Sequence, residues 1–148
     1  MKNNNVLVKI ATKDMTPDLI RFSAETLKPS NDAIYNKEFL CAQGLRSSIA
    51  KGFVIVAHSD NDLCGMLRFY PQKRIEQISI YQFVVAKDFR GQGVVCKMLQ
   101  FLNTLFKGAI TCKCPINTQF NNYFEITGWD KKHATELEYT LWEWKVNE

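Results

Sequence analysis

Arg90-Gly91-Gln92-Gly93-Val94-Val95 joins two runs of different character. The run before it, Ile78 to Ala86, is rich in β-branched and aromatic residues and predicts a strand. In the run after it, Val94 to Phe106, apolar residues recur at the spacing of a helix. Two glycines in such a turn allow positive φ angles, and the first amides of the helix have no partner of their own. With the helix dipole and the charge of Arg90, they predict a site for a phosphate or pyrophosphate, although glycines in such turns also serve close packing alone.

Two other phosphate-binding motifs do not fit this turn. A Walker motif needs Lys followed by Ser or Thr after its last glycine, whereas Val94, Val95 and Cys96 follow here. A dinucleotide-binding fingerprint needs a third glycine one turn later and an acidic residue about twenty positions on, where this chain has Ile110 to Cys112. Neither family accounts for the turn.

A second motif lies downstream, after a short predicted strand. It starts at Asn117 and ends in Asn122-Tyr123-Phe124-Glu125-Ile126-Thr127-Gly128-Trp129. Together with the glycine turn it resembles the GNAT superfamily of acetyl-CoA-dependent N-acyltransferases. In that family a turn of the form Gln/Arg-x-x-Gly-x-Gly/Ala binds the pyrophosphate at the start of the central helix. A later strand is followed by Asn and a helix with the ending Phe-Tyr-Glu-Lys-x-Gly-Phe.

The resemblance implies a fold and a reaction. The fold is α+β in a single domain of residues 1–148. Its central sheet is mixed but mostly antiparallel, with about six to seven strands flanked by about four helices. The reaction is transfer of an acyl group from acetyl-CoA to a primary amine of a small molecule or protein, by direct attack in a ternary complex. Acetyl-CoA is the expected cosubstrate, and no metal is expected.

The resemblance also assigns a set of cofactor-binding residues. The amides from Gln92 to Cys96 receive the pyrophosphate, and the backbone of Phe83 to Val85 aligns the pantetheine arm like an added strand. Val95 stands where the family prefers Gly or Ala, so its side chain either crowds the pyrophosphate or turns inward. Asn117 is expected to contact the cofactor, to cap the following helix, or both. The full set is Phe83, Val84, Val85, Arg90, Gly91, Gln92, Gly93, Val94, Val95, Cys96 and Asn117.

The proton donor for the departing thiolate is less clear from the sequence. The family places Tyr just before the Glu of its helix ending, and this chain has Phe124 there with Tyr123 one residue earlier. One residue on a helix rotates a side chain by roughly 100°. Tyr123 is therefore a candidate donor, with a packed or surface aromatic as the alternative and solvent as the alternative donor.

The base that deprotonates the amine is a second open question. Some relatives carry Glu eleven residues before the leading Gln/Arg, and Ser79 has that position here. Strand alternation turns Glu76 to the opposite face, which favours a solvated role for it. Gln77, Ser79 and Tyr81 share the face that relatives use for the acceptor, so they are expected to hold a water chain, with Tyr81 ranked first.

The order of predicted elements agrees with this fold. Thr16-Pro17-Asp18 indicates a helix start with Thr16 as the cap, and Pro29 ends that helix. The predicted strands are 6–11, 53–58, 63–70, 75–86, 109–114, 130–134 and 136–146, and the predicted helices are 16–28, 31–50, 94–106 and 117–127.

Composition restricts the setting of the protein. The chain has 148 residues, a net charge of +4 and five cysteines. The odd count and the absence of paired spacing favour a reducing compartment, and the apolar runs are too short for a membrane span. Cys112 and Cys114 are expected to be small buried hydrophobes rather than metal ligands. We therefore expect a cytoplasmic protein, monomeric or homodimeric, with an amine acceptor and no membrane partner.

Two other functions remain compatible with the sequence. One is an acyl-CoA-binding or regulatory module with weak or lost catalysis, supported by Val95 and Phe124. The other is an acyltransferase that acts on nucleic acid, suggested only by the basic charge and by aromatics such as Tyr70. No single basic face is evident, so a nucleic-acid partner is not the expectation.

Overall fold

The computed structural model describes residues 5–26, 42–60, 62–116, 120–135 and 139–145. The strands in these ranges are β1 Val6–Ile10, β2 Val54–Ser59, β3 Asp62–Pro71, β4 Gln77–Val85, β5 Ala109–Pro115, β6 Asp130–Thr135 and β7 Tyr139–Glu143. The α-helices are α1 Thr16–Thr26, α2 Ala42–Ala50, α3 Val94–Leu105 and α4 Phe120–Ile126. The predicted α+β class is confirmed, since the described residues hold seven strands and four α-helices.

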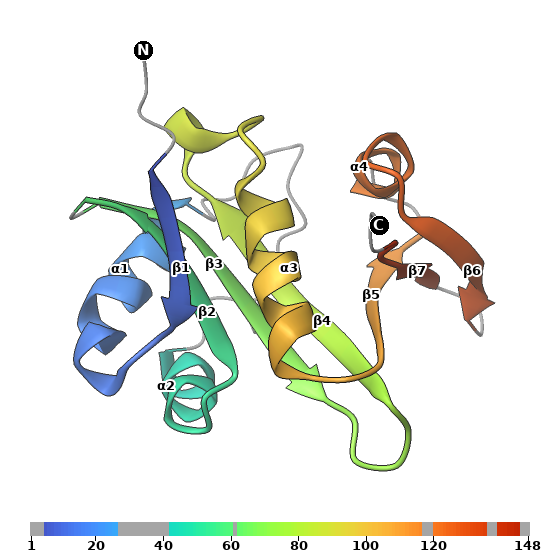
Figure 1. The fold of residues 1–148 in the computed structure, drawn as a ribbon, viewed down its shortest axis with the longest axis horizontal. Coiled ribbons are helices and arrows are strands. Elements are labelled where there is room, and N and C mark those ends of the chain that lie inside the picture. Colours follow the sequence, from blue (N-terminus) through green and yellow to red (C-terminus); the bar gives the residue numbers. More distant parts are fainter. Residues whose placement is uncertain (1–4, 27–41, 61, 117–119, 136–138, 146–148) are drawn as a thin grey trace.

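All seven strands belong to one sheet, in the order β1-β2-β3-β4-β5-β7-β6. Neighbouring strands are antiparallel except β4 and β5, which are parallel and are connected through α3. In Figure 1, α3 lies over the middle of the sheet, and α4 lies to the right with β5, β6 and β7. The single parallel pair thus lies where the two halves of the sheet meet.

Helices cover both faces of the sheet, and the alternation of β2 makes this clear. Ile55 and Ala57 belong to a core cluster that includes α3 residues such as Met98. Val54 and Val56, which point the other way, belong to a second cluster with α1 and α2. A strand buried on both faces reads as a continuous apolar run, as the sequence of β2 does.

The start of α1 differs from the prediction that Thr16 is its cap. Thr16 already has helical angles, with φ −54° and ψ −49°, and its hydroxyl donates to the Lys13 carbonyl at 2.7 Å. A 3-10 turn, Lys13–Met15, leads directly into the helix, and Thr12 takes the cap position of that turn. The extra turn moves the cap position upstream, which the local sequence pattern did not reveal.

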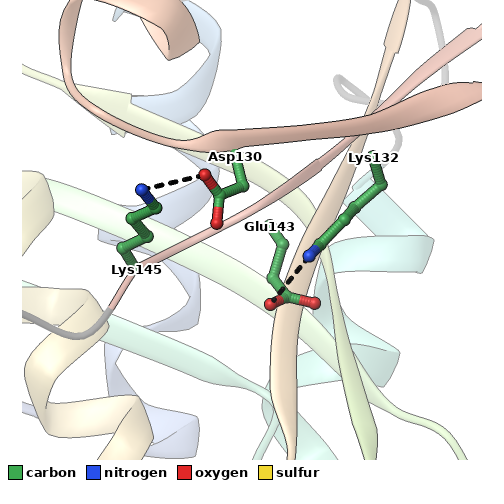
Figure 2. A network of polar contacts seen from close by, with 4 residues as sticks. All are labelled: Asp130, Lys132, Glu143 and Lys145. Atoms are coloured by element: carbon green, nitrogen blue, oxygen red, sulfur yellow. Dashed lines mark ion pairs between the residues drawn. The ribbon is translucent and has the colours of Figure 1, made fainter.

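The far edge of the sheet is formed by β6, which pairs with β7. Figure 2 shows two ion pairs on this hairpin, Asp130 with Lys145 at 3.0 Å and Lys132 with Glu143 at 3.7 Å. Exposed pairs of this kind stabilise a fold by at most about 1 kcal/mol. Charged side chains on an edge strand also disfavour pairing with a further strand.

Candidate active site

β4 and β5 are paired over only part of their length. Gln77 to Ile80 pair with Ala109 to Cys112, and beyond Ile80 no described residue of β5 pairs with β4. On its other side β4 stays paired with β3 up to its last residue. Gln82 to Val85, here called the unpaired edge of β4, therefore have no β5 residue opposite them in the described ranges. Phe83 to Val85, expected to align the pantetheine arm, lie on this edge.

The glycine turn leads from the end of β4 into α3. A 3-10 turn, Lys87–Phe89, follows the strand, and Gly93 is the N-cap of α3. The φ angles of Gly91 and Gly93 are +77° and +78°, values that a residue with a side chain adopts only with strain. A Cβ atom built on either glycine would have no described non-neighbour atom within 4 Å. The outer side of the turn is thus open, as an anion-binding turn requires.

The first amides of α3 point into this turn. The first helical hydrogen bond runs from the Lys97 amide to the Gly93 carbonyl at 3.0 Å, so the amides of Val94, Val95 and Cys96 precede the hydrogen-bond ladder. Gly93 has no side chain with which to cap them. The half-buried Val95 side chain packs against the α3 core cluster, which favours the inward of its two possible orientations. The positive end of the helix dipole therefore faces the turn, and the N-cap residue Gly93 offers no side chain to satisfy the first amides.

Two side-chain hydrogen bonds hold the turn, and one of them reaches β4. Arg90 donates through Nε to the Val85 carbonyl at 3.2 Å. Gln92 donates through Nε2 to the Asp88 carbonyl at 3.0 Å. Both side chains are exposed, and the Arg90 guanidinium adds a permanent positive charge where the strand ends. The turn is thereby held in a defined shape next to the unpaired edge of β4.

Helix α4 buries Phe124 fully and Tyr123 partly, and both rings lie near Phe83 of β4. Phe124 is 3% exposed, and its ring centroid lies 5.0 Å from that of Trp129 and 5.6 Å from that of Trp142. The Tyr123 ring lies 5.6 Å from the ring of Phe83 on β4. The residue at the position of the family's Tyr is thus part of the core, and Tyr123 lies beside the unpaired edge of β4.

The environment of Tyr123 keeps its phenol protonated. Burial raises the pKa of Tyr123, and the nearby Cys96 thiol raises it further, while a hydrogen bond with Thr127 lowers it. A phenol with a raised pKa is neutral at physiological pH, which is the form that donates a proton. The protonation state of Tyr123 therefore agrees with the donor role for which the sequence makes it a candidate.

Tyr81 occupies a β-bulge in β4. Arg68 of β3 pairs with Gln82, and the next residue of β3, Phe69, pairs with Ile80. Tyr81 is therefore the extra residue of the bulge and has no residue opposite it in β3. A bulge of one residue reverses the side-chain alternation of the strand beyond it.

The reversal is visible in the two core clusters. Ile80, before the bulge, and Phe83, after it, both belong to the cluster on the α3 side. Val84 belongs to the cluster on the α1 and α2 side. Because Gln82 alternates with Phe83, its side chain faces the α1 and α2 side. Regular alternation from Ile80 would instead put Gln82 on the α3 side.

Three side chains meet on the α1 and α2 side of the bulge. Arg68 donates through Nε to Ser48 Oγ of α2 at 2.8 Å. The Arg68 guanidinium carbon lies 4.4 Å from the ring centroid of Tyr81, a cation–π contact. Tyr81 is thus on the face predicted for it, and the bulge changes the direction only of the residues that follow it. Arg68 was missed because only the register of β3 brings it to this face.

The other members of the predicted water chain have side-chain partners. Ser79 Oγ accepts a hydrogen bond from Gln72 Nε2 at 2.8 Å. Gln77 donates through Nε2 to Thr111 Oγ1 at 2.9 Å. Glu76 is exposed and precedes β4, as expected of a solvated residue. The bulge lies beyond these residues and does not change the direction of Glu76.

Some predicted features lie elsewhere. Asn117, the predicted cofactor contact or helix cap, lies outside the described residues.

Cys112 and Cys114 are buried in the α3 core cluster. Burial, with a further contribution from Cys114, raises the pKa of Cys112 to about 12. A thiol with that pKa stays protonated and packs as a small apolar group. Within the described ranges, no helix has the length and apolar character needed to cross a membrane.

Two shallow depressions of about 290 Å³ lie at the other end of the parallel pair, away from the glycine turn. One is lined by Gly108 and Trp144, and the other by the turn between β3 and β4 together with Phe106. Neither includes Tyr81, Gly93 or Tyr123, so neither is the site described above.

Comparison with known proteins agrees with this geometry. The model of the acetyltransferase (GNAT) family matches residues 17–126, which is more than half of the chain. No curated protein matches the chain.

Several solved structures have a similar fold. The PaiA N-acetyltransferase of Thermoplasma acidophilum, solved in complex with coenzyme A, has a TM-score of 0.76 and 11% identity, covering 96% of this chain and 99% of its own. A GNAT acetyltransferase of Listeria monocytogenes has a TM-score of 0.75 and 16% identity, covering 95% of each chain. One of Bacillus cereus has a TM-score of 0.72 and 15% identity, covering 97% of this chain and 99% of its own. With the family match over residues 17–126, the chain belongs to the GNAT family of acetyltransferases.

Proposed function

We propose that residues 1–148 form a single-domain N-acetyltransferase that uses acetyl-CoA and acetylates a primary amine of a small molecule or protein. The observation that carries this proposal is the stretch Gln82 to Val85 of β4, which has no β5 residue opposite it in the described ranges and continues into the open glycine turn at the start of α3. An extended pantetheine arm along that edge leads its pyrophosphate to the helix N-terminus. The coenzyme A bound by the Thermoplasma neighbour supports the choice of cosubstrate.

The proposed reaction is direct attack in a ternary complex. The uncharged amine nitrogen bonds to the acetyl carbonyl carbon, and the carbon–sulfur bond breaks. The nitrogen loses its proton to water near Ser79 and Tyr81, and the leaving thiolate takes a proton from Tyr123 or from solvent. In this proposal the backbone of Phe83 to Val85 and the α3 amides bind and orient the cosubstrate.

The test of this function uses acetyl-CoA and a panel of amines. We expect acetyl-CoA to raise the Tm of the protein, because a ligand bound only by the folded state stabilises it. We expect thiol release that requires an amine, with a rate that rises with pH towards the pKa of that amine. A Tm shift without thiol release for any amine favours the binding-module alternative. Absence of the Tm shift contradicts the proposal.

Tyr123→Phe is expected to lower kcat by less than about tenfold, with unchanged affinity for acetyl-CoA. A well-placed general acid contributes about a hundredfold or more, but a coenzyme A thiolate is stable enough to take its proton from water. The measurement is steady-state kinetics with calorimetry of cofactor binding. A thousandfold loss of kcat with intact binding would make Tyr123 the obligatory donor.

A further inference from the structure

Gln82 carries a side-chain amide that has no partner in the described structure. The residue is 6% exposed, and neither Nε2 nor Oε1 has a hydrogen-bond partner among the described residues. A buried polar group without a partner costs about 1–3 kcal/mol. Native proteins rarely keep two such atoms on one side chain without a ligand, water or catalytic role for them.

The location of Gln82 relates this amide to the site. Ile80 is the last residue of β4 paired with β5, and Gln82 lies two residues further along the strand. Its side chain faces α1 and α2, on the same side of the sheet as the contact between Arg68 and Tyr81. It therefore lies next to the point where the strands part, on the face opposite α3.

A second buried polar atom faces the same layer. Ser23 of α1 is 2% exposed, and its hydroxyl has no hydrogen-bond partner in the described ranges. Ser23 follows Leu19 by one helical turn, and Leu19 packs in the cluster that contains Val84. The layer between the sheet and the first helices thus contains unsatisfied polar atoms from both sides.

We propose that the amide of Gln82 binds the amine acceptor directly. Oε1 accepts a hydrogen bond from an N–H of the attacking amine, and Nε2 donates to an oxygen of the acceptor a few bonds from that nitrogen. The inference rests on the proposed function and specifies its substrate class. The acceptor is an amine with a nearby carbonyl oxygen, such as a carboxamide or carboxylate.

The hydrogen-bonding groups of the Gln82 amide are the reason for choosing this substrate class. An amide side chain has one acceptor oxygen and one donor nitrogen, and both need partners when they are buried. A plain alkylamine or a polyamine offers N–H groups but no oxygen, so it leaves Nε2 unsatisfied. Sites built to bond a polar group discriminate strongly against analogues that lack that group.

The activity test compares two acceptors of nearly equal shape, β-alaninamide and 3-methylbutylamine. We expect Gln82→Met to lower the ratio of their kcat/KM values, amide over alkylamine, by tenfold or more. The Kd for acetyl-CoA should stay unchanged, because the pyrophosphate turn is not altered. An unchanged ratio in an active Gln82→Met enzyme overturns the inference and leaves the proposed function standing.

A stability test checks the premise of the inference, that the Gln82 amide has no partner within the protein, without any acceptor. Gln82→Met replaces an unsatisfied buried amide with an apolar side chain of similar size, so we expect Tm to rise by about 2–4 °C. The matched control is Gln77→Met, on the same strand, because the Gln77 amide is bonded to Thr111. That variant should have a lower Tm than the wild type. If Gln82→Met lowers Tm as much as Gln77→Met does, Gln82 has its partners within the protein and the inference fails.

Failure of the proposed function gives a different result from failure of the Gln82 inference alone. If the function is wrong, the wild-type protein shows no Tm shift with acetyl-CoA and no thiol release with any amine. Because the inference rests on that function, it then fails as well, whichever way the Gln82→Met stability result falls.

Discussion

Gly93→Glu is expected to weaken acetyl-CoA binding by at least a hundredfold while the protein stays folded. A Cβ atom at Gly93 meets no described non-neighbour atom within 4 Å, so the new side chain projects into the space proposed for the pyrophosphate. A carboxylate about 4 Å from a phosphate charge costs about 4 kcal/mol at the effective dielectric of a protein surface. Calorimetric titration with acetyl-CoA measures the loss, and circular dichroism checks the fold.

The matched control for this variant is Gly93→Gln. Both side chains have nearly the same volume, and both place a residue at the φ of +78°, which costs about 1–2 kcal/mol. The difference in Kd between them therefore isolates the charge. We expect the glutamine variant to bind at least tenfold more tightly than the glutamate variant. If Gly93→Glu binds acetyl-CoA with wild-type affinity, the pyrophosphate does not bind at this turn.

The second large effect is expected at Gly108, where the chain enters β5. A Cβ atom there would lie 2.2 Å from the Glu76 carbonyl oxygen, and the φ of Gly108 is +119°. The Ala109 amide donates to that same oxygen at 3.2 Å, which joins the start of β5 to the start of β4. Gly108→Ala must separate these backbones, and we expect it to lower the free energy of unfolding by about 3 kcal/mol or more.

Gly52→Ala is the control for backbone strain alone. Gly52 has a φ of +80°, and an added Cβ there meets no described non-neighbour atom within 4 Å. Its cost should be only about 1–2 kcal/mol. Urea unfolding of both variants separates strain from collision. Equal losses in the two variants would mean that the strands move apart easily at Gly108.

The register that Gly108 sets also affects the site. It places Gln77 opposite Ala109, and the pairing then ends at Ile80 opposite Cys112. A shift of β5 would move the point at which the two strands part. We therefore expect any folded Gly108→Ala protein to bind acetyl-CoA more weakly, although the turn at Gly93 is unchanged.

Local patterns were sufficient to predict most of the fold. The apolar spacing of α3, the strand-forming composition of β4 and the glycines between them are signals contained in neighbouring residues. The same holds for the amides at the start of α3, because a helix N-terminus after a glycine turn has the same chemistry in any fold. The positive electrostatic character of the glycine turn and the order of the helices and strands could therefore be predicted from the sequence alone.

The composition of the β4 face that points to α1 and α2 could not be predicted in this way. Regular alternation puts Ser79 and Tyr81 on one face and Gln82 on the other, but the bulge at Tyr81 brings Gln82 to the α1 and α2 side. The bulge exists only as a mismatch in register between β3 and β4, two strands whose pairing no local pattern encodes.

The amino-acid sequence by itself determined the elements, the family resemblance and the open glycine turn, because these depend on residues close together in the chain. Only the tertiary structure decided that Phe124 is buried in the core while Tyr123 stays partly exposed beside the same Phe83 ring, and that Arg68 meets Tyr81. The physical reason is that these contacts join separate strands and helices. Their geometry follows from strand register and helix packing, which are properties of the assembled sheet.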